Sequence, residues 1–367
     1  MRVLQIGMSK GYGGVESFVM TYFRSLKDSG IIFDFVDIYG DGLAYSDEIL
    51  ALGGRIYTLY NYKKHPLAAR RQLKRILSEN GYDCVHIHML SAANLIPLTV
   101  CIQAGITPVV HSHNNDTVGI LKKTLHTLNL PFLRSSRAVK LACGEEAGRW
   151  MFGAEPFAVI PNAIAVDRFR YREENRRKYR EQCDAGEETL VLGFVGRLEY
   201  QKNPLFLMEI LAALKENGRE DCKLLLIGEG SMEAQMRQKA EQLGVADRVI
   251  FAGRQLDVGN WLSAMDIFLL PSHFEGLCIC AVEAQCAGLP ALFAEGVPRE
   301  TALTDLPVFL STDKGPGIWA AAIKEQQLST ANRDAYAVRM ENSPYSITAS
   351  SEMLKEIYLR AAQESKQ

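Results

Sequence analysis

The stretch IFLLPSHFEGLCICAVEAQCAGLPALF, residues 267–293, decides the fold of this chain. A short aliphatic run at 267–270 leads into a turn that contains proline and glycine. An apolar, helix-like segment follows from about 279 to 287, and a second aliphatic run occupies 291–293. Two short apolar strands connected by a helix form the βαβ unit of a parallel sheet. The stretch therefore predicts an α/β fold.

The same alternation of strand and helix extends in both directions along the chain. Near-continuous apolar strands separated by helices are typical of a parallel sheet covered on both faces. The strands expected before residue 165 are 3–7, 32–38, 55–59, 84–88, 108–111, 138–142 and 157–160. The helices expected there are 17–29, 66–80, 92–104, 119–133 and 145–152. The strands expected afterwards are 190–195, 223–227, 248–251, 267–270 and 291–293, with helices at 204–217, 232–243, 258–264, 279–287 and 346–364.

The chain length of 367 residues predicts more than one domain. Residues 161–189 are dense in charge and poor in aliphatic side chains, which suits an interdomain connection. We therefore expect two Rossmann-like domains, at 1–165 and 189–345, joined by a charged connection at 166–188. The last helix, 346–364, is expected to pack back on the first domain. Such an arrangement places a ligand cleft at the carboxyl ends of two parallel sheets.

Composition narrows the classes of function. A net charge of −2 gives no global electrostatic reason for nucleic-acid binding. The sequence predicts neither a secretory signal nor a membrane-spanning segment, because it shows no leader-like N-terminus and no sufficiently long apolar run. The eight cysteines lie among aliphatic residues without a CxxC pair, so we expect small buried hydrophobes in a reducing, cytoplasmic compartment.

Two strand-to-helix turns carry candidate phosphate-binding features. In GFVGRLEYQKNP, residues 193–204, Arg197 and Lys202 follow a strand and precede a helix that opens at an Asn–Pro pair. Cations at this edge of a parallel sheet suit a phosphate clamp, although a solvated basic loop is the alternative. In LLLIGEGS, residues 224–231, Gly228 and Gly230 allow close approach of a ligand to the backbone.

The opening stretch carries two acids on either side of a helix N-terminus. Glu275 lies in the loop before the helix, and Glu283 lies about one turn inside it. The free N–H groups at the start of the helix favour an anion. Two glutamates around an anion site suit hydroxyl groups on either side of a phosphate. The alternative is that Glu283 interacts only with the helix dipole and that Glu275 is solvated.

These motifs together resemble the family 4 retaining glycosyltransferases of GT-B fold. The resemblance rests on the segments GYGGVESF (11–18), VIPNAI (159–164), VGRLEYQKNP (195–204), IGEGS (227–231) and DIFLLPSHFEG (266–276) with its following helix. The segments span nearly the whole chain in the family's order. Within the family the sequence is similar to bacterial enzymes of exopolysaccharide or capsule synthesis. One departure is Ala165, where the family usually has an aspartate that shapes the interdomain connection.

The resemblance implies a role for each matching residue at the donor site. Glu283 would bind the ribose hydroxyls, Glu275 would hold donor-sugar hydroxyls, and Arg254 would lie near the base. Arg197 and Lys202 would neutralise the diphosphate. Its backbone ligands would come from Gly276, Leu277, Cys278 and Ile279. The cysteines of this helix would then serve packing only.

The resemblance also implies residues of the first domain and the reaction. Gly13 and Gly14 would close over the diphosphate, and His113 would face the reacting sugar and the acceptor. The first domain would bind the acceptor and the second the nucleotide sugar, with a UDP-sugar favoured. The acceptor would be a glycan or a polyprenyl-diphosphate-linked sugar, and no cofactor would be required. The alternatives are a nucleotide-sugar epimerase of the same architecture and a non-catalytic nucleotide-sugar-binding subunit.

Two further features leave a choice open. The pairs HIH (86–88) and HSHN (111–114) place histidines on one face of each of two adjacent strands, which suits either a metal site or core packing. We expect core packing and no metal. The basic segment KKHPLAARRQLKRILSE, residues 63–79, suits either a solvated helix face or docking to an anionic membrane. Docking would place the protein peripherally at the inner face of the cell membrane.

Overall fold

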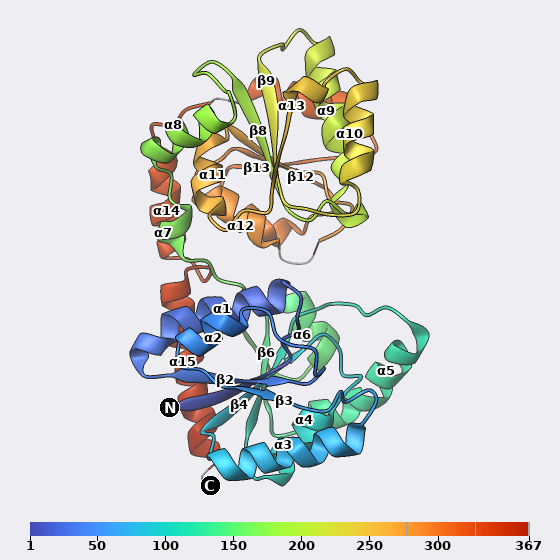
Figure 1. Cartoon of the computed structure of the whole chain (residues 1–367), viewed down its shortest axis with the longest axis vertical. Coiled ribbons are helices and arrows are strands. Elements are labelled where there is room, and N and C mark those ends of the chain that lie inside the picture. The colour runs from blue at the N-terminus through green and yellow to red at the C-terminus, as the bar shows by residue number, and fades with distance from the viewer. Residues whose placement is uncertain (276–277, 327, 366–367) are drawn as a thin grey trace. The chain divides into compact units, whose positions relative to one another are not determined.

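The computed structural model describes residues 1–275, 278–326 and 328–365. The chain divides into an N-terminal unit, Met1–Ala163 with Pro344–Gln367, and a C-terminal unit, Ile164–Ser343. Each unit is built around its own parallel sheet with helices on both faces (Figure 1). The α/β prediction with two Rossmann-like units is confirmed.

The described residues of the N-terminal unit form a seven-stranded sheet in the order β3-β2-β1-β4-β5-β6-β7. Its strands are β1 Arg2–Ile6, β2 Ile32–Asp37, β3 Ile56–Thr58, β4 Cys84–Met89, β5 Pro108–Ser112, β6 Val139–Ala142 and β7 Ala158–Val159. Its α-helices are α1 Gly14–Leu26, α2 Ser46–Ala51, α3 Pro66–Asn80, α4 Ile96–Gln103, α5 Ile120–Ser135, α6 Glu145–Phe152 and α15 Ile347–Glu364.

Two apolar layers hold this sheet between its helices. Phe23 and Phe33 stack in the layer under α1, to which α15 contributes Leu354 and Tyr358. Leu73 of α3 and Leu98 of α4 belong to the layer on the other face. The C-terminal helix α15 thus lies in the N-terminal unit, packed against α1.

The described residues of the C-terminal unit form a six-stranded sheet in the order β10-β9-β8-β11-β12-β13. Its strands are β8 Leu190–Val195, β9 Cys222–Ile227, β10 Val249–Gly253, β11 Ile267–Leu270, β12 Ala291–Ala294 and β13 Pro307–Leu310. Its α-helices are α7 Val166–Phe169, α8 Glu173–Gln182, α9 Pro204–Glu216, α10 Glu233–Gln242, α11 Val258–Ala264, α12 Ile279–Cys286, α13 Pro316–Glu325 and α14 Arg333–Glu341.

The charged segment 166–188, expected from its composition to connect the two domains, belongs to the C-terminal unit and is partly helical. It contains α7 and α8, and α8 packs on α11 within the C-terminal unit. Arg180 of α8 is buried and pairs with Asp266 at 3.0 Å, while Arg176 reaches the same carboxylate at 2.6 Å. A buried arginine is tolerated here because its guanidinium is fully paired. The dense charge of this segment suggested an interdomain connection. In the structure, the arginines of the segment form the ion pairs that hold α8 in place.

Candidate functional site

The loop between β8 and α9 carries the two predicted phosphate-binding cations. Arg197 is exposed and donates a hydrogen bond to Gln201 Oε1 at 3.4 Å. Lys202 turns inward instead and forms an ion pair with Glu275, with 2.7 Å between Nζ and Oε1. The Lys202 and Glu275 side chains are only 12% and 6% exposed. The structure thus brings these two predicted site residues into direct contact.

Two cysteines complete this charged group. The Cys278 Sγ lies 3.5 Å from Lys202 Nζ and 3.2 Å from the Cys280 Sγ. The hydrogen bond from Cys280 lowers the pKa of Cys278 against the opposing effect of burial, and Lys202 lowers it further. The prediction that these cysteines serve packing alone is therefore wrong for Cys278 and Cys280. Lys202, the partner of Cys278, is distant in sequence, so the sequence pattern does not show this contact.

The same charges act on Lys202. Burial lowers the pKa of Lys202, but the neighbouring Cys280, Cys278 and Glu275 together raise it by more. The net pKa lies above the ordinary lysine value. Lys202 therefore carries a full positive charge at neutral pH, in a place where little water screens it.

Glu283 lies one turn inside α12, as predicted, and is partly buried. Burial raises the pKa of its carboxyl to about 7, and Arg168 opposes this shift. Among the described residues no side chain hydrogen-bonds to the Glu283 carboxyl, whereas Glu275 has both Lys202 and Gln201 as partners. The carboxyl oxygens of Glu283 can therefore accept hydrogen bonds from a ligand's hydroxyl groups.

The start of α12 falls partly outside the described residues. Cys278 is the N-cap residue and Ile279 is the first residue of the helix. Gly276 and Leu277, which were predicted to contribute backbone groups, lie outside the described residues. Arg254 directly follows β10 and is exposed.

The glycines of the 224–231 turn act on the protein backbone. A Cβ at Gly228 would lie 1.9 Å from the Gly196 carbonyl oxygen, and one at Gly230 would lie 2.3 Å from that of Leu198. Both positions therefore require glycine so that this turn can pack against the loop that carries Arg197 and Lys202. Gly228 and Gly230 thus allow this protein loop to approach closely, whereas the sequence suggested that they allow a ligand to do so.

In the N-terminal unit, the glycine-rich loop before α1 is ordered by Glu16. Its Oε1 accepts hydrogen bonds from the Ser9 backbone N–H and hydroxyl, each at 2.8 Å, and its Oε2 accepts one from the Gly13 N–H at 3.1 Å. The bond from the Gly13 N–H to Glu16, the third residue of the helix, caps α1, which begins at Gly14, three residues earlier than expected. Gly13 and Gly14 therefore sit at a helix N-terminus, where backbone N–H groups favour an anion.

His113 is half-buried and belongs to a histidine cluster formed with the buried His86, His88 and His111. The ring of Phe18 lies against all four, at centroid distances of 4.8–6.4 Å. Burial lowers the pKa of each imidazole, in the case of His113 to about 3. All four rings are therefore neutral at physiological pH.

Hydrogen bonds within this cluster fix the tautomer of His113. Gln5 Oε1 can only accept, so the His88 Nε2–H donates to it at 2.8 Å. The neutral His88 ring then has an acceptor at Nδ1, which lies 2.8 Å from His113 Nε2. His113 must therefore carry its proton on Nε2, which leaves its Nδ1 as a hydrogen-bond acceptor. Sequence reasoning selected His113 and assigned His88 to core packing, but it missed Gln5.

The metal alternative for these histidines is geometrically open for His86, His88 and His111. One ligand nitrogen from each lies within 4.8 Å of the others, and neutral imidazoles are suitable zinc ligands. Both nitrogens of His88 already have partners, Gln5 and His113. A metal would have to displace one of these hydrogen bonds.

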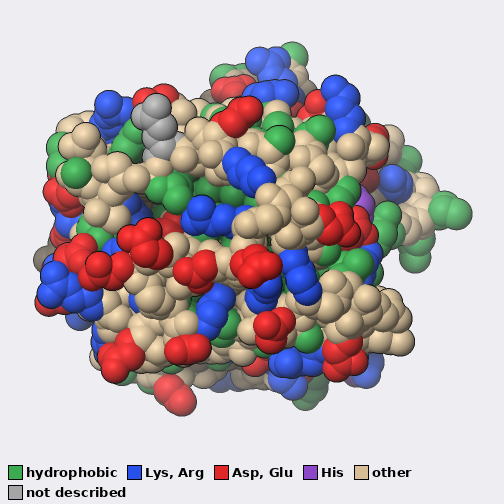
Figure 2. Space-filling view, turned by 90° about the horizontal axis from the view of Figure 1, so that it is seen from above, with side chains coloured by type: hydrophobic (Ala, Val, Ile, Leu, Met, Phe, Trp, Pro, Cys, Tyr) green, Lys and Arg blue, Asp and Glu red, His purple; other side chains and the backbone are tan. Residues whose placement is uncertain are grey.

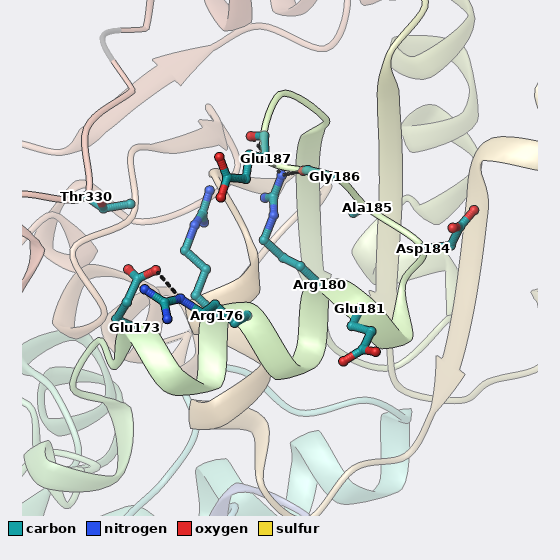
Figure 3. Close-up of a pocket in the computed structure, with 10 residues that line it drawn as sticks. Glu173, Arg176, Arg180, Glu181, Asp184, Ala185, Gly186, Glu187 and Thr330 are labelled. Atoms are coloured by element: carbon teal, nitrogen blue, oxygen red, sulfur yellow. Dashed lines mark hydrogen bonds and ion pairs between the residues drawn. The ribbon is translucent and has the colours of Figure 1, made fainter.

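A hollow of about 600 Å³ beside α8 contains none of the predicted site residues. Figure 3 shows Arg176 and Arg180 projecting from α8 toward the loop that carries Gly186 and Glu187. Arg180 donates to the backbone carbonyls of Thr189 and Ala264, at 2.5 and 3.2 Å, in addition to its ion pair with Asp266. Because Arg176 and Arg180 are already paired within the protein, we interpret this hollow as a structural feature and not as a ligand site.

Comparisons with known proteins agree with this fold and motif set. The protein-family model described as "Glycosyltransferase Family 4" matches residues 12–168, and the family model described as "Glycosyl transferases group 1" matches residues 175–303. The Bacillus subtilis protein EpsF, named as a glycosyltransferase, is 31% identical over 88% of this chain and 86% of its own length. An Escherichia coli protein named UDP-Gal:alpha-D-GlcNAc-diphosphoundecaprenol alpha-1,3-galactosyltransferase is 26% identical over 60% of this chain and 59% of its own.

Among solved structures, HepE of Anabaena in complex with UDP has a TM-score of 0.81 at 17% identity, covering 98% of this chain and all of that one. At this identity the likeness shows the fold alone. The fold and the family matches together place the protein among the glycosyltransferases. The chain belongs to the family 4 glycosyltransferases of GT-B fold.

Proposed function

We propose that this glycosyltransferase moves a sugar from a UDP-sugar to a glycan or polyprenyl-diphosphate-linked acceptor, with retention at the anomeric carbon, in bacterial exopolysaccharide or capsule synthesis. The observation that carries the proposal is the buried Lys202–Glu275 pair next to the N-terminus of α12. UDP in the solved HepE complex and the lipid-diphosphate acceptor named for the E. coli relative support the substrate classes.

The proposed chemistry follows from where charge develops. As the glycosidic bond to the donor breaks, negative charge grows on the β-phosphate oxygen. Lys202, Arg197 and the N–H groups at the start of α12 are proposed to stabilise this charge. A preorganised donor of this kind contributes about 3–4 kcal/mol to a transition state. The leaving phosphate accepts the proton of the acceptor hydroxyl, which attacks on the face that the leaving group vacates.

The remaining residues are proposed to orient the substrates. Glu283 accepts hydrogen bonds from the ribose hydroxyls, and Arg254 lies near the base. Glu275 accepts hydrogen bonds from the donor-sugar hydroxyls as well as from Lys202. Gly13 and Gly14 form the loop that closes over the diphosphate. His113 presents its unprotonated Nδ1 as an acceptor for a sugar hydroxyl.

The proposed reaction takes place at the cytoplasmic face of the membrane and requires no divalent cation. The eight cysteines are free thiols, which suits a reducing compartment. In the described part of the chain, no helix is both long and apolar enough to cross a membrane. Activity that is unchanged in the presence of EDTA is expected.

A donor screen followed by product analysis tests the proposal. UDP is expected to raise the melting temperature more than GDP or ADP, because a ligand that binds only the folded state stabilises it. With a UDP-sugar panel and a synthetic polyprenyl-diphosphate-linked sugar, NMR of the product is expected to show the anomeric configuration of the donor. An inverted product would contradict retention. Epimerised donor without transfer, or binding without any turnover, would contradict the transferase itself.

A further inference from the structure

Helix α5, Ile120–Ser135, exposes an apolar face to solvent. The residues of this face, here called the α5 stripe, are Leu121, Leu125, Leu128 and Phe132. Their spacing of three and four residues places them on one side of the helix. Leu121 and Leu128 are 74% and 70% exposed, and Val118 and Ile120, just ahead of the stripe, are 87% and 88% exposed. Figure 2 shows hydrophobic side chains projecting at the right-hand edge, the side on which Figure 1 draws α5.

The opposite face of α5 is firmly packed, so the stripe does not result from a loosely attached helix. His126 is buried, stacks on Trp150 of α6 at a centroid distance of 4.2 Å and accepts a hydrogen bond from the Ala92 N–H at 3.0 Å. Leu133 is fully buried in the core. Rotating the helix to hide the stripe would break these contacts. The stripe is therefore exposed by the fold itself.

The surroundings of the stripe favour one kind of partner. Residues 117–144 contain five lysines and arginines and no aspartate or glutamate. Lys122 and Arg137 are exposed. Lys123 forms an ion pair with Asp116, which lies just outside the segment, with 3.3 Å between Nζ and Oδ1. The hydroxyls of Thr124 and Thr127 donate to backbone carbonyls of α5, each at 3.0 Å, and so are satisfied within the helix. A convex apolar ridge next to cations matches the interface of an anionic lipid bilayer.

The basic helix α3, which the sequence suggested for this role, fits it less well. Leu73 and Leu77 are buried, and Leu67 is the exposed leucine of α3 among the described residues. Arg70 is held by Thr99 and Gln103, and Arg75 pairs with Glu79. Helix α3 therefore presents a solvated polar face and lacks an apolar surface that could insert into lipid.

We propose that the α5 stripe docks this protein on an anionic membrane surface by inserting its leucines and Phe132 among the lipid acyl chains. The surface lies outside the residues assigned to sugar transfer. Docking is measured without donor or acceptor, so its failure can be told apart from failure of the transferase.

Flotation with vesicles tests the proposal. The intact chain is expected to float with phosphatidylcholine vesicles that contain one-third phosphatidylglycerol, and less with pure phosphatidylcholine. The triple variant Leu121→Ser, Leu125→Ser, Leu128→Ser is expected to bind the anionic vesicles at least about tenfold more weakly, because burial of each leucine contributes strongly to transfer from water. Lys122→Gln is expected to weaken binding less, and only at low salt.

A matched control removes the same apolar area elsewhere. The variant Leu50→Ser, Leu67→Ser, Leu359→Ser changes exposed leucines of α2, α3 and α15 and is expected to float like the unaltered chain. Absence of flotation with anionic vesicles at low salt would overturn the proposal, as would equal losses in the two triple variants. A dimer in sedimentation velocity that the α5 variant alone dissolves, without vesicle binding, would assign the stripe to a second copy of the chain instead.

Discussion

Each unit buries a polar cluster, and the two clusters differ in how they carry charge. In the N-terminal unit the four histidines are neutral; His88 bonds to His113 and to Gln5, and His86 bonds to Tyr358. In the C-terminal unit Lys202 and Glu275 are charged and bonded as an ion pair. Neutral buried groups need only hydrogen-bond partners, whereas buried charges need an opposite charge. The comparison predicts that disturbing the C-terminal cluster has the larger effect.

The largest effect is expected from Lys202→Met. This change removes the buried cation and leaves Glu275 without its ion-pair partner. Transfer is expected to fall about 100- to 1,000-fold in kcat/KM, equivalent to about 3–4 kcal/mol. Steady-state kinetics measures this loss. The control is Lys239→Met, which breaks an ion pair with Glu209 in the same unit and is expected to retain activity. Equal losses in the two variants would remove Lys202 from the site.

Glu283→Gln is expected to have the next largest effect. Loss of a charged hydrogen-bond acceptor costs about 1.5–3 kcal/mol, so UDP affinity is expected to fall about 10- to 150-fold. Since burial raises the pKa of Glu283 to about 7, the carboxylate form increases through that pH. UDP binding by the unaltered chain should therefore tighten from pH 6 to pH 8, and the variant should lose this dependence. Calorimetry at several pH values measures both effects. Glu216→Gln, an exposed acid of α9, is the control.

A smaller effect is expected from His88→Leu in the neutral cluster. This change leaves Gln5 Oε1 and His113 Nε2 without a partner, at a cost of about 1–3 kcal/mol in the free energy of unfolding. His113 also loses the bond that fixes its tautomer, so kcat is expected to fall while the KM for the donor changes little. His126→Leu should lose similar stability without loss of kcat. If both variants lose kcat alike, His88 is only a packing residue.

The smallest effect is a pH dependence of the N-terminal unit. Burial lowers the pKa of His111 below its unfolded value of about 6.5, so the unfolded state binds more protons as the pH falls. Stability is therefore fully present above about pH 6.5 and is lost as the pH falls below it. Hydrogen exchange at the β4 and β5 amides, corrected for intrinsic rates, should show this loss. His111→Leu should reduce it, and an unchanged loss would contradict the neutral-core interpretation.

The sequence by itself determined the alternation of strand and helix, the presence of two Rossmann-like units and the membership of the family. These features depend on local apolar periodicity and on motifs such as 195–204 and 266–276, which are contiguous in the chain. Most strand positions in both units follow directly from this pattern. Helix α8 was missed because its burial depends on Asp266, some 90 residues further along the chain.

The tertiary structure alone decided which polar groups meet. Lys202 is separated from Glu275 and Cys278 by more than 70 residues in sequence, as Gln5 is from His88, and no periodicity shows that these residues touch. The leucine spacing of α5 is readable from the sequence, yet a periodic pattern defines a face without showing whether that face meets a neighbour or solvent. Packing of His126 and Leu133 against the rest of the unit settles that choice, because a helix can bury only the side on which its neighbours lie.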